Sequence, residues 1–185
     1  EGWEDAAVPP DQLGKYLRGF RALLDRYGYR ASLYGHFGQG CVHTRINFDL
    51  VTAPGIAKFR AFVHDAADAV LRFGGSLSGE HGDGQSRAEL LPKMFGPELV
   101  EAFREFKAIW DPEGRMNPGK IVDPYRADEN LRHQPARRPS VLPDPAFAYS
   151  SDAGDFSRAL MRCVGVGECR RTKGGVMCPS FMVTR

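Results

Sequence analysis

Hydrophobic residues between positions 11 and 27 recur at steps of three and four, which is the period of an α-helix with one buried face. Gly28 follows and is a favoured helix-ending residue. A similar pattern extends over residues 55–73 and ends at the pair Gly74-Gly75. A third helix should begin near Pro97, because proline suits the first helical turn, and should end at Trp110. The chain therefore predicts three helices with hydrophobic faces.

Between the first two helices the period changes to two, which is typical of β-strands. We expect strands over residues 30–36 and 42–50, joined by a glycine-containing loop. In the second strand one face carries Val42, Thr44, Ile46, Phe48 and Leu50, and the other carries His43, Arg45, Asn47 and Asp49. Two strands in a hairpin with helices around them predict the α+β class, an antiparallel sheet flanked by helices, and not a parallel βαβ array.

Composition adds little to this interpretation. The 185 residues are 42% hydrophobic and 26% charged, which is ordinary for a globular domain. A net charge of +2 gives no reason to expect nucleic acid as a partner, and no apolar run has the length of a membrane span. The chain starts at Glu1 without an initiator methionine, so we expect it to be a piece of a longer protein. Whether it forms homo-oligomers stays open.

Residues 123–155 differ from the rest, because they combine five prolines with charged and small residues and show no periodic hydrophobic positions. This composition predicts an extended linker. Three cysteines then crowd the last segment, Cys163, Cys169 and Cys178, and the third is followed by proline. Three clustered thiols fit metal or cluster ligation better than disulfides, and the Cys178-Pro179 end resembles iron–sulphur ferredoxin segments, with three unrelated reduced cysteines as the alternative. The predicted parts are thus a domain over 1–122, a linker over 123–155 and an incomplete iron–sulphur segment over 156–185.

Two glycine-rich stretches carry the candidate chemistry. The first contains His36 and His43, and the second contains Glu80 and His81. In a hairpin, His36 and His43 would project from the same end, and Glu80 from a separate loop would complete a His2Glu set that suits catalytic zinc, with manganese or iron also acceptable. His81 would then remain as a general base. The alternative is that these histidines only cap turns, and spacing alone leaves the two interpretations about even.

Three ordered motifs carry a resemblance to a known family. They are Gly35-His36-x-Gly-x-Gly-x-x-His43, Ser78-Gly-Glu80-His81-Gly-x-Gly84 and Asp111-Pro-x-Gly-x-x-Asn117-Pro-Gly-Lys120. Together they resemble the C-terminal cap of the FAD-linked oxidases, which include D-lactate, glycolate and D-2-hydroxyglutarate dehydrogenases. The proline-rich linker and the cysteines make the chain similar to the large members that are fused to an iron–sulphur half. The resemblance covers about residues 10–125 and the tail.

This resemblance implies roles at individual positions. His36, His43 and Glu80 match metal ligands, and His81 matches the base that takes the hydroxyl proton while the C2 hydride goes to FAD. Asn117 and Lys120 match the segment that returns to the flavin domain. Arg45 and Asn47 share the strand face of His43, and we expect them to bind substrate, with an ion pair of Arg45 to a neighbouring acid such as Asp49 as the structural alternative. The family usually has other residues at Gln39, Cys41 and Arg45, which leaves the identity of the hydroxyacid open. The flavin domain is expected upstream, and Cys163, Cys169 and Cys178 would supply part of a 4Fe-4S site that is completed downstream.

We therefore expect a fragment of an FAD-dependent dehydrogenase that oxidises a D-2-hydroxyacid to the 2-oxoacid, inactive by itself, with a zinc or manganese ion and an electron acceptor that the sequence does not identify. Two rival functions remain: a metal-dependent hydrolase without flavin, and a non-catalytic metal-binding interaction module. Reduced cysteines favour a cytoplasmic location. Association with the cytoplasmic side of a membrane through the electron acceptor stays open.

Overall fold

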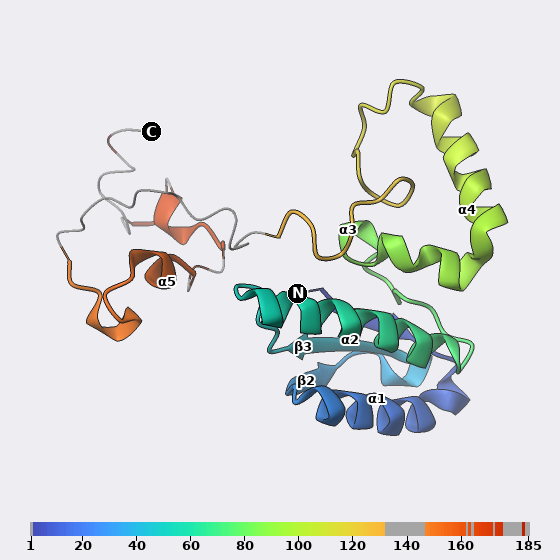
Figure 1. Cartoon of the computed structure of the whole chain (residues 1–185), viewed down its shortest axis with the longest axis horizontal. Helices are drawn as coiled ribbons and strands as arrows, with labels where there is room; N and C mark the ends of the chain where they lie inside the picture. Colours follow the sequence, from blue (N-terminus) through green and yellow to red (C-terminus); the bar gives the residue numbers. More distant parts are fainter. Residues whose placement is uncertain are drawn as a thin grey trace. The chain divides into compact units, whose positions relative to one another are not determined.

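The structure is a computed structural model that describes residues 2–131, 147–161, 163, 165–171, 173–175 and 183. The chain divides into two compact units, Glu1–Arg137 and Arg138–Arg185. The first unit contains the sheet and the long helices and is shown in Figure 1 from blue to yellow.

The first unit has an α+β fold, as the sequence predicts. Its elements in chain order are β1 (Asp5–Ala7), the 3-10 helix η1 (Pro10–Gln12), α1 (Leu13–Tyr27), β2 (Ala31–Tyr34), η2 (Phe37–Gln39), β3 (Cys41–Ile46), α2 (Ala53–Leu71), α3 (Gly84–Arg87), η3 (Ala88–Leu90) and α4 (Leu91–Trp110). The strands form one antiparallel sheet in the order β1-β3-β2, so β3 is the central strand.

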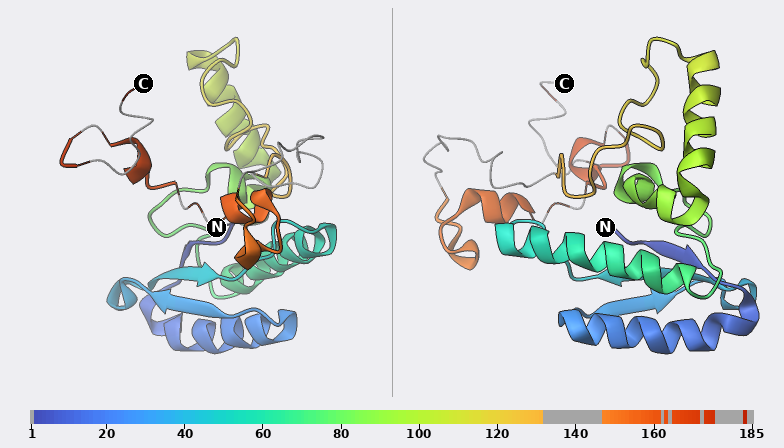
Figure 2. Two further views of the ribbon diagram at one scale, coloured as in Figure 1. Left: turned by 90° about the vertical axis from the view of Figure 1, so that its left-hand side faces the viewer. Right: turned by 45° about the vertical axis from the view of Figure 1, so that its right-hand side comes forward.

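The two long helices beside the sheet have recognisable caps. Gly28 ends α1 in the left-handed conformation, with φ of 62°. Thr52 caps the start of α2, because its side chain accepts a hydrogen bond from the backbone N–H of Gly55. Figure 2 shows both helices beside the sheet from two further directions. The predicted helices over 11–27 and 55–73 are therefore confirmed, with starts shifted by two residues and with α2 ending at Leu71 instead of directly before Gly74-Gly75.

The predicted hairpin is confirmed, but its strands are shorter than expected. β3 ends at Ile46, because Asp49 turns back to accept hydrogen bonds from the backbone N–H groups of Val51 and Thr52 just before α2. Residues 47–50 therefore form the approach to a helix and do not extend the strand. β1 was not predicted, since three residues are too few for a recognisable period of two.

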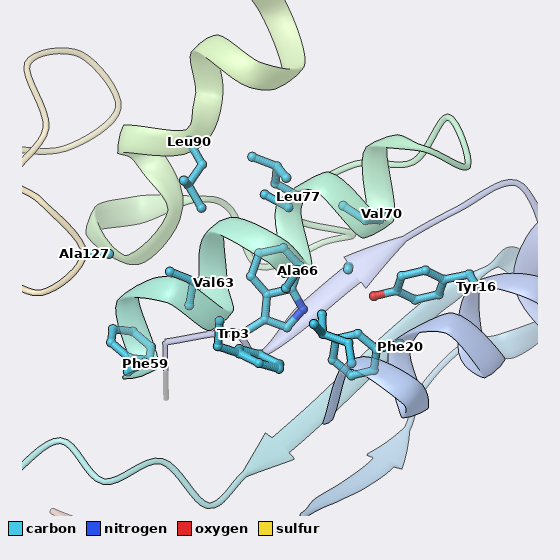
Figure 3. Packing of buried hydrophobic residues seen from close by; sticks show 14 of the residues in the cluster. Trp3, Tyr16, Phe20, Phe59, Val63, Ala66, Val70, Leu77, Leu90 and Ala127 are labelled. Atoms are coloured by element: carbon cyan, nitrogen blue, oxygen red, sulfur yellow. The ribbon is translucent and has the colours of Figure 1, made fainter. Parts of the chain in front are cut away.

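Side chains of both helices and of the sheet meet in one hydrophobic core. Trp3 and Phe62 are almost fully buried within it, and Ala31, Leu33 and Ile46 pack against it from one face of the sheet. Figure 3 shows Trp3 beside α2, with Phe20 and Tyr16 of α1 nearby. The core thus fixes one face of the sheet and leaves the opposite face of β3 available for polar side chains.

The third predicted helix exists but is part of a longer element. α4 starts at Leu91 and is broken at Gly96, whose φ of 77° and ψ of 161° are not helical. A new helical segment then starts at Pro97, as expected from its preference for the first turn. The short helices α3 and η3 before it were not predicted. They hold Arg87 and Leu90 inside the protein, where both side chains are buried.

Packing of the first unit continues beyond residue 122, where we placed its end. Ala127 is buried in the hydrophobic core, and Asp128 accepts a hydrogen bond from Arg60 of α2 at 2.8 Å. The first residues of the expected linker are therefore packed, which its lack of periodic hydrophobic positions did not indicate. The central part of that linker, with most of its prolines, lies outside the described residues.

The second unit contains only short elements in its described part. These are η5 (Ser150–Asp152), α5 (Phe156–Met161) and η6 (Glu168–Arg170). Cys163 and Cys169 are exposed free thiols, whereas Cys178 lies outside the described residues. In the described parts of both units, every helix is too short or too polar to pass through a bilayer.

Candidate metal and active site

The first group of polar side chains is placed by β3 and by the loop that precedes it. His43 lies in β3, directly between Asp5 of β1 and Tyr34 of β2. His36 lies in the loop after β2, and its carbonyl accepts hydrogen bonds from the backbone N–H groups of Gln39 and Cys41. Gly40 closes this loop with φ of 78°, and a Cβ atom there would lie 1.9 Å from the carbonyl oxygen of Val8. Only glycine fits such a turn against β1.

The second group comes from the loop between α2 and α3, which runs beside β1. Ser76 and Ala7 exchange backbone hydrogen bonds of 2.7 and 3.2 Å and join the start of this loop to the strand. Further along, a Cβ atom at Gly79 would lie 2.5 Å from Sγ of Cys41, so glycine permits the loop to approach β3 closely. Glu80 and His81 follow directly and therefore reach the same side of the sheet as His43.

Asp5 anchors this loop. Its Oδ2 accepts hydrogen bonds from the backbone N–H groups of Gly79, Glu80 and His81 at 2.9, 2.7 and 3.1 Å. The hydroxyl of Ser78 donates to the same carboxylate. Because the carboxylate holds three successive residues, the direction of the Glu80 and His81 side chains depends on it.

A buried guanidinium balances the charge of Asp5. Arg87 lies 2.8 Å from Oδ1 of Asp5, and both side chains are almost completely buried. Arg87 also donates to the carbonyl oxygens of Asp5 and Gly82, which ties α3 to β1 and to the loop. Burial raises the pKa of Asp5, but the hydrogen bonds from Glu80 and His81 and the charge of Arg87 outweigh it and leave the pKa below its ordinary value. The anchor is therefore a carboxylate at neutral pH.

The loops bring together the histidines and the carboxylate that the motifs indicate. Nε2 of His43 lies 2.6 Å from Oε1 of Glu80, and Nε2 of His36 lies 3.7 Å from the same oxygen. One ligand atom from each of these residues lies within 4.8 Å of the others. Nε2 of His81 is 3.6 Å from Oε1 of Glu80, and its ring centroid is 4.7 Å from that of His43. Imidazole and carboxylate groups in this arrangement have the chemistry of a divalent metal site, although metal binding itself stays a prediction.

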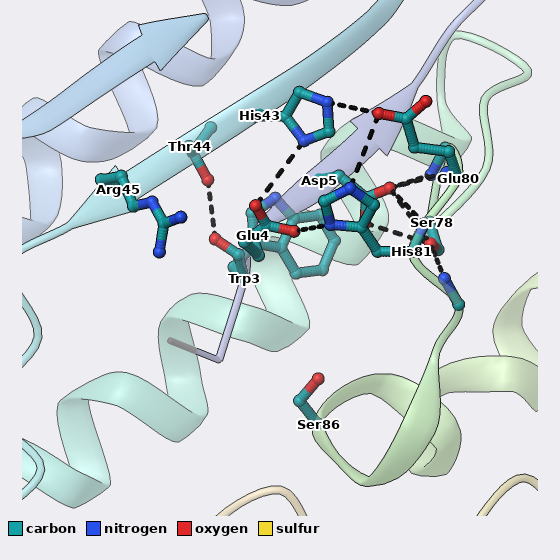
Figure 4. A network of polar contacts seen from close by, with 12 residues as sticks. Trp3, Glu4, Asp5, His43, Thr44, Arg45, Ser78, Glu80, His81 and Ser86 are labelled. Carbon is teal, nitrogen blue, oxygen red and sulfur yellow. Dashed lines mark hydrogen bonds and ion pairs between the residues drawn. The ribbon is translucent and has the colours of Figure 1, made fainter. Parts of the chain in front are cut away.

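Glu4 is the group in this cluster that the sequence did not reveal. Figure 4 shows its carboxylate below His43 and beside His81, opposite Glu80. One oxygen bonds Nδ1 of His81, and the other lies 3.6 Å from Nδ1 of His43. The acidic pair Glu4-Asp5 stands before a short hydrophobic run, which was the available signal, but nothing in its spacing connects it to motifs more than thirty residues away.

One side of the cluster is open to solvent. The side chains of His36, His81 and Glu80 are 61%, 49% and 40% exposed, whereas that of His43 is only 6% exposed. Cys41, two residues before His43 on β3, is buried. Burial raises the pKa of the Cys41 thiol, and the charges of Glu80, Asp5 and Glu4 raise it further. The cysteine is therefore protonated at neutral pH. A small ligand would approach the cluster past the exposed side chains of His36, His81 and Glu80.

Arg45 and Asn47 lie further along the hairpin. Arg45 is exposed, and its Nε donates to the hydroxyl of Tyr34 at 3.2 Å, while the Tyr34 ring stacks on His43 with centroids 5.1 Å apart. The carboxamide oxygen of Asn47 accepts a 2.7 Å hydrogen bond from the backbone N–H of Arg30, which holds the two ends of the hairpin together. The structure therefore connects Arg45 with the histidine cluster and shows Asn47 in a backbone contact.

Asn117 and Lys120 lie outside the cluster, in the turns that follow α4. Asn117 has a φ of 47° in a region where asparagine is one of the few tolerated side chains. Nζ of Lys120 donates to Oε1 of Gln85 in α3 at 2.9 Å. Lys120 is thus connected to the helix that follows the Glu80 loop, and neither residue contacts a histidine of the cluster among the described interactions.

A three-stranded antiparallel sheet with helices, carrying histidines and glutamate on glycine-rich loops, agrees with a known domain family. Residues 2–121 match the model for "FAD linked oxidases, C-terminal domain". This match covers more than half of the chain, and the chain therefore belongs to that family.

Curated relatives extend the comparison. A D-2-hydroxyglutarate dehydrogenase of Haemophilus influenzae is 34% identical and covers 98% of this chain, and the corresponding protein of Pseudomonas putida is 36% identical with the same coverage. A D-lactate dehydrogenase of Archaeoglobus fulgidus is 36% identical but covers only 64% of this chain. The chain spans 17% and 18% of the length of the first two relatives and 26% of the third. The similarity to the first two includes the cysteine segment, whereas that to the third does not extend over the whole chain.

Proposed function

We propose that this chain is the substrate-binding and metal-binding part of an FAD-dependent dehydrogenase that oxidises a D-2-hydroxyacid to the 2-oxoacid. The observation that carries this proposal is the convergence of three imidazoles and two carboxylates in a chain that belongs to the FAD-linked oxidases. The relatives that cover almost the whole chain are named D-2-hydroxyglutarate dehydrogenase. That hydroxyacid is therefore the first substrate to test, before D-lactate and glycolate.

His36, His43 and Glu80 would hold a divalent ion, zinc or manganese. Two imidazole nitrogens and one carboxylate oxygen within a few ångström fit either ion. When bound, such an ion supplies Lewis-acid polarisation of the oxygens of a hydroxyacid. The low exposure of His43 limits competition by water at that ligand, and the exposed side chains of His36 and Glu80 leave room for substrate.

His81 would take the proton from the substrate hydroxyl. Its side chain is about half exposed, it borders the proposed ligands, and its backbone is fixed by Asp5. A held imidazole with one free nitrogen is a competent general base at neutral pH. FAD, bound mainly by an upstream domain, supplies the acceptor for the C2 hydride. Removal of the hydroxyl proton and of the hydride together converts the alcohol carbon into the ketone.

Arg45 would bind a carboxylate of the substrate, with Asn47 as a second polar group further along the hairpin. Arg45→Lys keeps the charge but removes the planar fork, and losing one charge-assisted hydrogen bond of about 1.5 kcal/mol should raise KM about tenfold. The melting temperature should change no more than in the control variant Arg104→Lys on α4, where the arginine pairs with Asp123. A larger loss of stability than of affinity would assign Arg45 a structural role.

Phe106, Ile109 and Trp110 of α4 are 65–73% exposed, and a monomeric protein rarely leaves such large apolar side chains together in water. Together with Asn117 and Lys120 in the following turns, they would face the flavin domain.

Cys163, Cys169 and Cys178 would supply three thiolates to an iron–sulphur cluster, so a four-cysteine 4Fe-4S site needs a ligand from elsewhere. Through such clusters electrons would pass to an acceptor, in a cytoplasmic enzyme.

Anaerobic mixing tests the proposed reaction. The polypeptide that joins this chain to its flavin domain should be yellow, and D-2-hydroxyglutarate should bleach it with one 2-oxoglutarate formed per flavin. D-lactate and glycolate in parallel determine the substrate. Hydrolysis of an ester or amide without any change of flavin colour would instead support a metal-dependent hydrolase. No turnover and no bleaching with any of the three hydroxyacids would contradict the proposal.

A further inference from the structure

We propose that Glu4 is a positioning residue that keeps a proton on Nδ1 of both His43 and His81. The Nε2 lone pairs of both rings then face Glu80, where one would bind the metal and the other would accept the substrate proton. This inference rests on the proposed function, but the protonation of the two rings is a property of this chain and can be measured without turnover.

The carboxylate of Glu4 lies on the side of the two rings that faces away from Glu80. Its Oε2 is hydrogen-bonded to Nδ1 of His81, and its Oε1 lies 3.6 Å from Nδ1 of His43. Nε2 of the same two rings lies 3.6 and 2.6 Å from Oε1 of Glu80. The two imidazoles therefore stand between two carboxylates, and each ring has its Nδ1 toward Glu4 and its Nε2 toward the proposed ligand Glu80.

Burial strengthens the effect of Glu4. Its side chain is 17% exposed and that of His43 is 6% exposed, so little water screens the interaction. Nδ1 of His43 is buried and makes no hydrogen bond to any described residue. At 3.6 Å the carboxylate is too distant for a normal hydrogen bond, and Oε1 of Glu80 is closer to the ring, at 2.6 Å from Nε2. A metal ion bound at Nε2 would leave Nδ1 as the protonated nitrogen, facing the carboxylate of Glu4. The hydroxyl of Tyr34 lies 3.5 Å from Oε1 of Glu4 and contributes to holding the Glu4 carboxylate in place.

The chemistry of imidazole explains why this contact matters. A neutral imidazole has one N–H donor and one nitrogen lone pair, and the hydrogen bond at one nitrogen decides which form is present. A carboxylate that accepts from Nδ1–H leaves the lone pair on Nε2. Such carboxylate–histidine contacts commonly orient metal ligands, and the same contact at His81 would orient the proposed base.

Glu4, His43 and His81 also have the composition of a second cation site, since their ligand atoms lie within 4.8 Å of one another. Two ions would require His43 to bind one through each nitrogen. A neutral ring has only one lone pair, so His43 would have to lose its last ring proton. One ion with Glu4 in a supporting role needs no such ionisation, and the structure favours it. The number of bound ions distinguishes the two arrangements.

Glu4→Gln tests the proposal, because it removes the charge and keeps the shape. The matched control is Glu105→Gln, which changes an exposed glutamate on α4. Two-bond ¹H–¹⁵N spectra of the zinc-free and zinc-loaded chain report which ring nitrogen carries the proton. Competition with a chromophoric chelator reports the zinc affinity, and elemental analysis reports the number of ions. Circular dichroism shows whether each variant is folded.

In the zinc-loaded wild type and in zinc-loaded Glu105→Gln, His43 and His81 should be protonated at Nδ1, with one zinc ion per chain. In Glu4→Gln the Nε2–H form should appear at His81, and zinc affinity should fall about 10–100-fold while saturation still gives one ion. Glu4→Asp keeps the charge on a shorter side chain and should retain more of the Nδ1–H form than Glu4→Gln. If Glu4→Gln does not fold, Glu4→Asp is measured in its place.

Unchanged ring protonation in Glu4→Gln would overturn the proposal, and so would two zinc ions in the wild type with one lost in the variant. A purely structural role for Glu4 would lower stability without changing the proton position. The spectra and the zinc titration use no hydroxyacid and no flavin. Failure of the oxidation proposal would therefore leave their result intact, and the two failures can be told apart.

Discussion

Replacing His81 by alanine should slow flavin reduction by about 10²–10⁴-fold, the usual contribution of a general base, while the metal stays bound. The substitution should affect flavin reduction but not metal content, because His36, His43 and Glu80 form the proposed ligand set without His81. Rapid anaerobic mixing with D-2-hydroxyglutarate measures the rate in the polypeptide that includes the flavin domain. Metal and flavin content are measured on the same sample.

The control is His64→Ala, which removes an imidazole from α2 that lies 3.8 Å from Glu89 and outside the cluster. It should reduce flavin at nearly the wild-type rate. If His81→Ala loses less than threefold, a different group takes the proton. If it loses the metal together with activity, His81 acts as a ligand, and the division of roles between Glu80 and His81 is wrong.

The second large effect is expected on stability. Asp5→Asn should lower the free energy of unfolding by about 3–5 kcal/mol, since removing one partner of a buried ion pair leaves the other charge uncompensated. Arg87 would be that charge, because its side chain is only 3% exposed. The substitution also weakens the acceptor for the backbone N–H groups of Gly79, Glu80 and His81. Zinc affinity should therefore decrease together with stability.

Urea denaturation of the metal-free chain measures the free energy of unfolding and so tests this prediction. Asp68→Asn is the matched control, because Asp68 forms a 2.6 Å ion pair with Lys93 in which the aspartate side chain is 54% exposed. An exposed pair contributes about 0–1 kcal/mol, so the control should unfold almost like the wild type. Equal destabilisation by the two substitutions would show that Asp5 does not anchor the loop.

The elements that the sequence predicted are those with a local signal. α1 and α2 carry long hydrophobic periods, with Gly28 at the end of α1 and Gly74-Gly75 soon after α2, and β2 and β3 are adjacent in the chain. β1 lacks such a signal, because three residues pair with β3 through contacts almost forty positions away. Local periodicity does not report this kind of pairing.

The residues of the candidate site also divide into those with a local sequence signal and those that depend on long-range contacts. His36, His43, Glu80 and His81 stand in glycine-rich motifs, and the structure brings them together as those motifs indicated. Glu4, Asp5 and Arg87 come from β1 and α3, and their roles depend on long-range contacts such as the Asp5–Arg87 ion pair. The substrate role expected for Asn47 stays a prediction, and in the structure its side chain accepts a hydrogen bond from the backbone N–H of Arg30.

The central claim is that His36, His43 and Glu80 bind one divalent metal beside His81, and counting metal in purified variants tests it most directly. Inductively coupled plasma mass spectrometry should find close to one zinc or manganese per wild-type chain. His43→Ala and Glu80→Gln should retain little, whereas His81→Ala and the control His64→Ala should retain nearly all. Equal metal in the wild type and in His43→Ala would contradict the account.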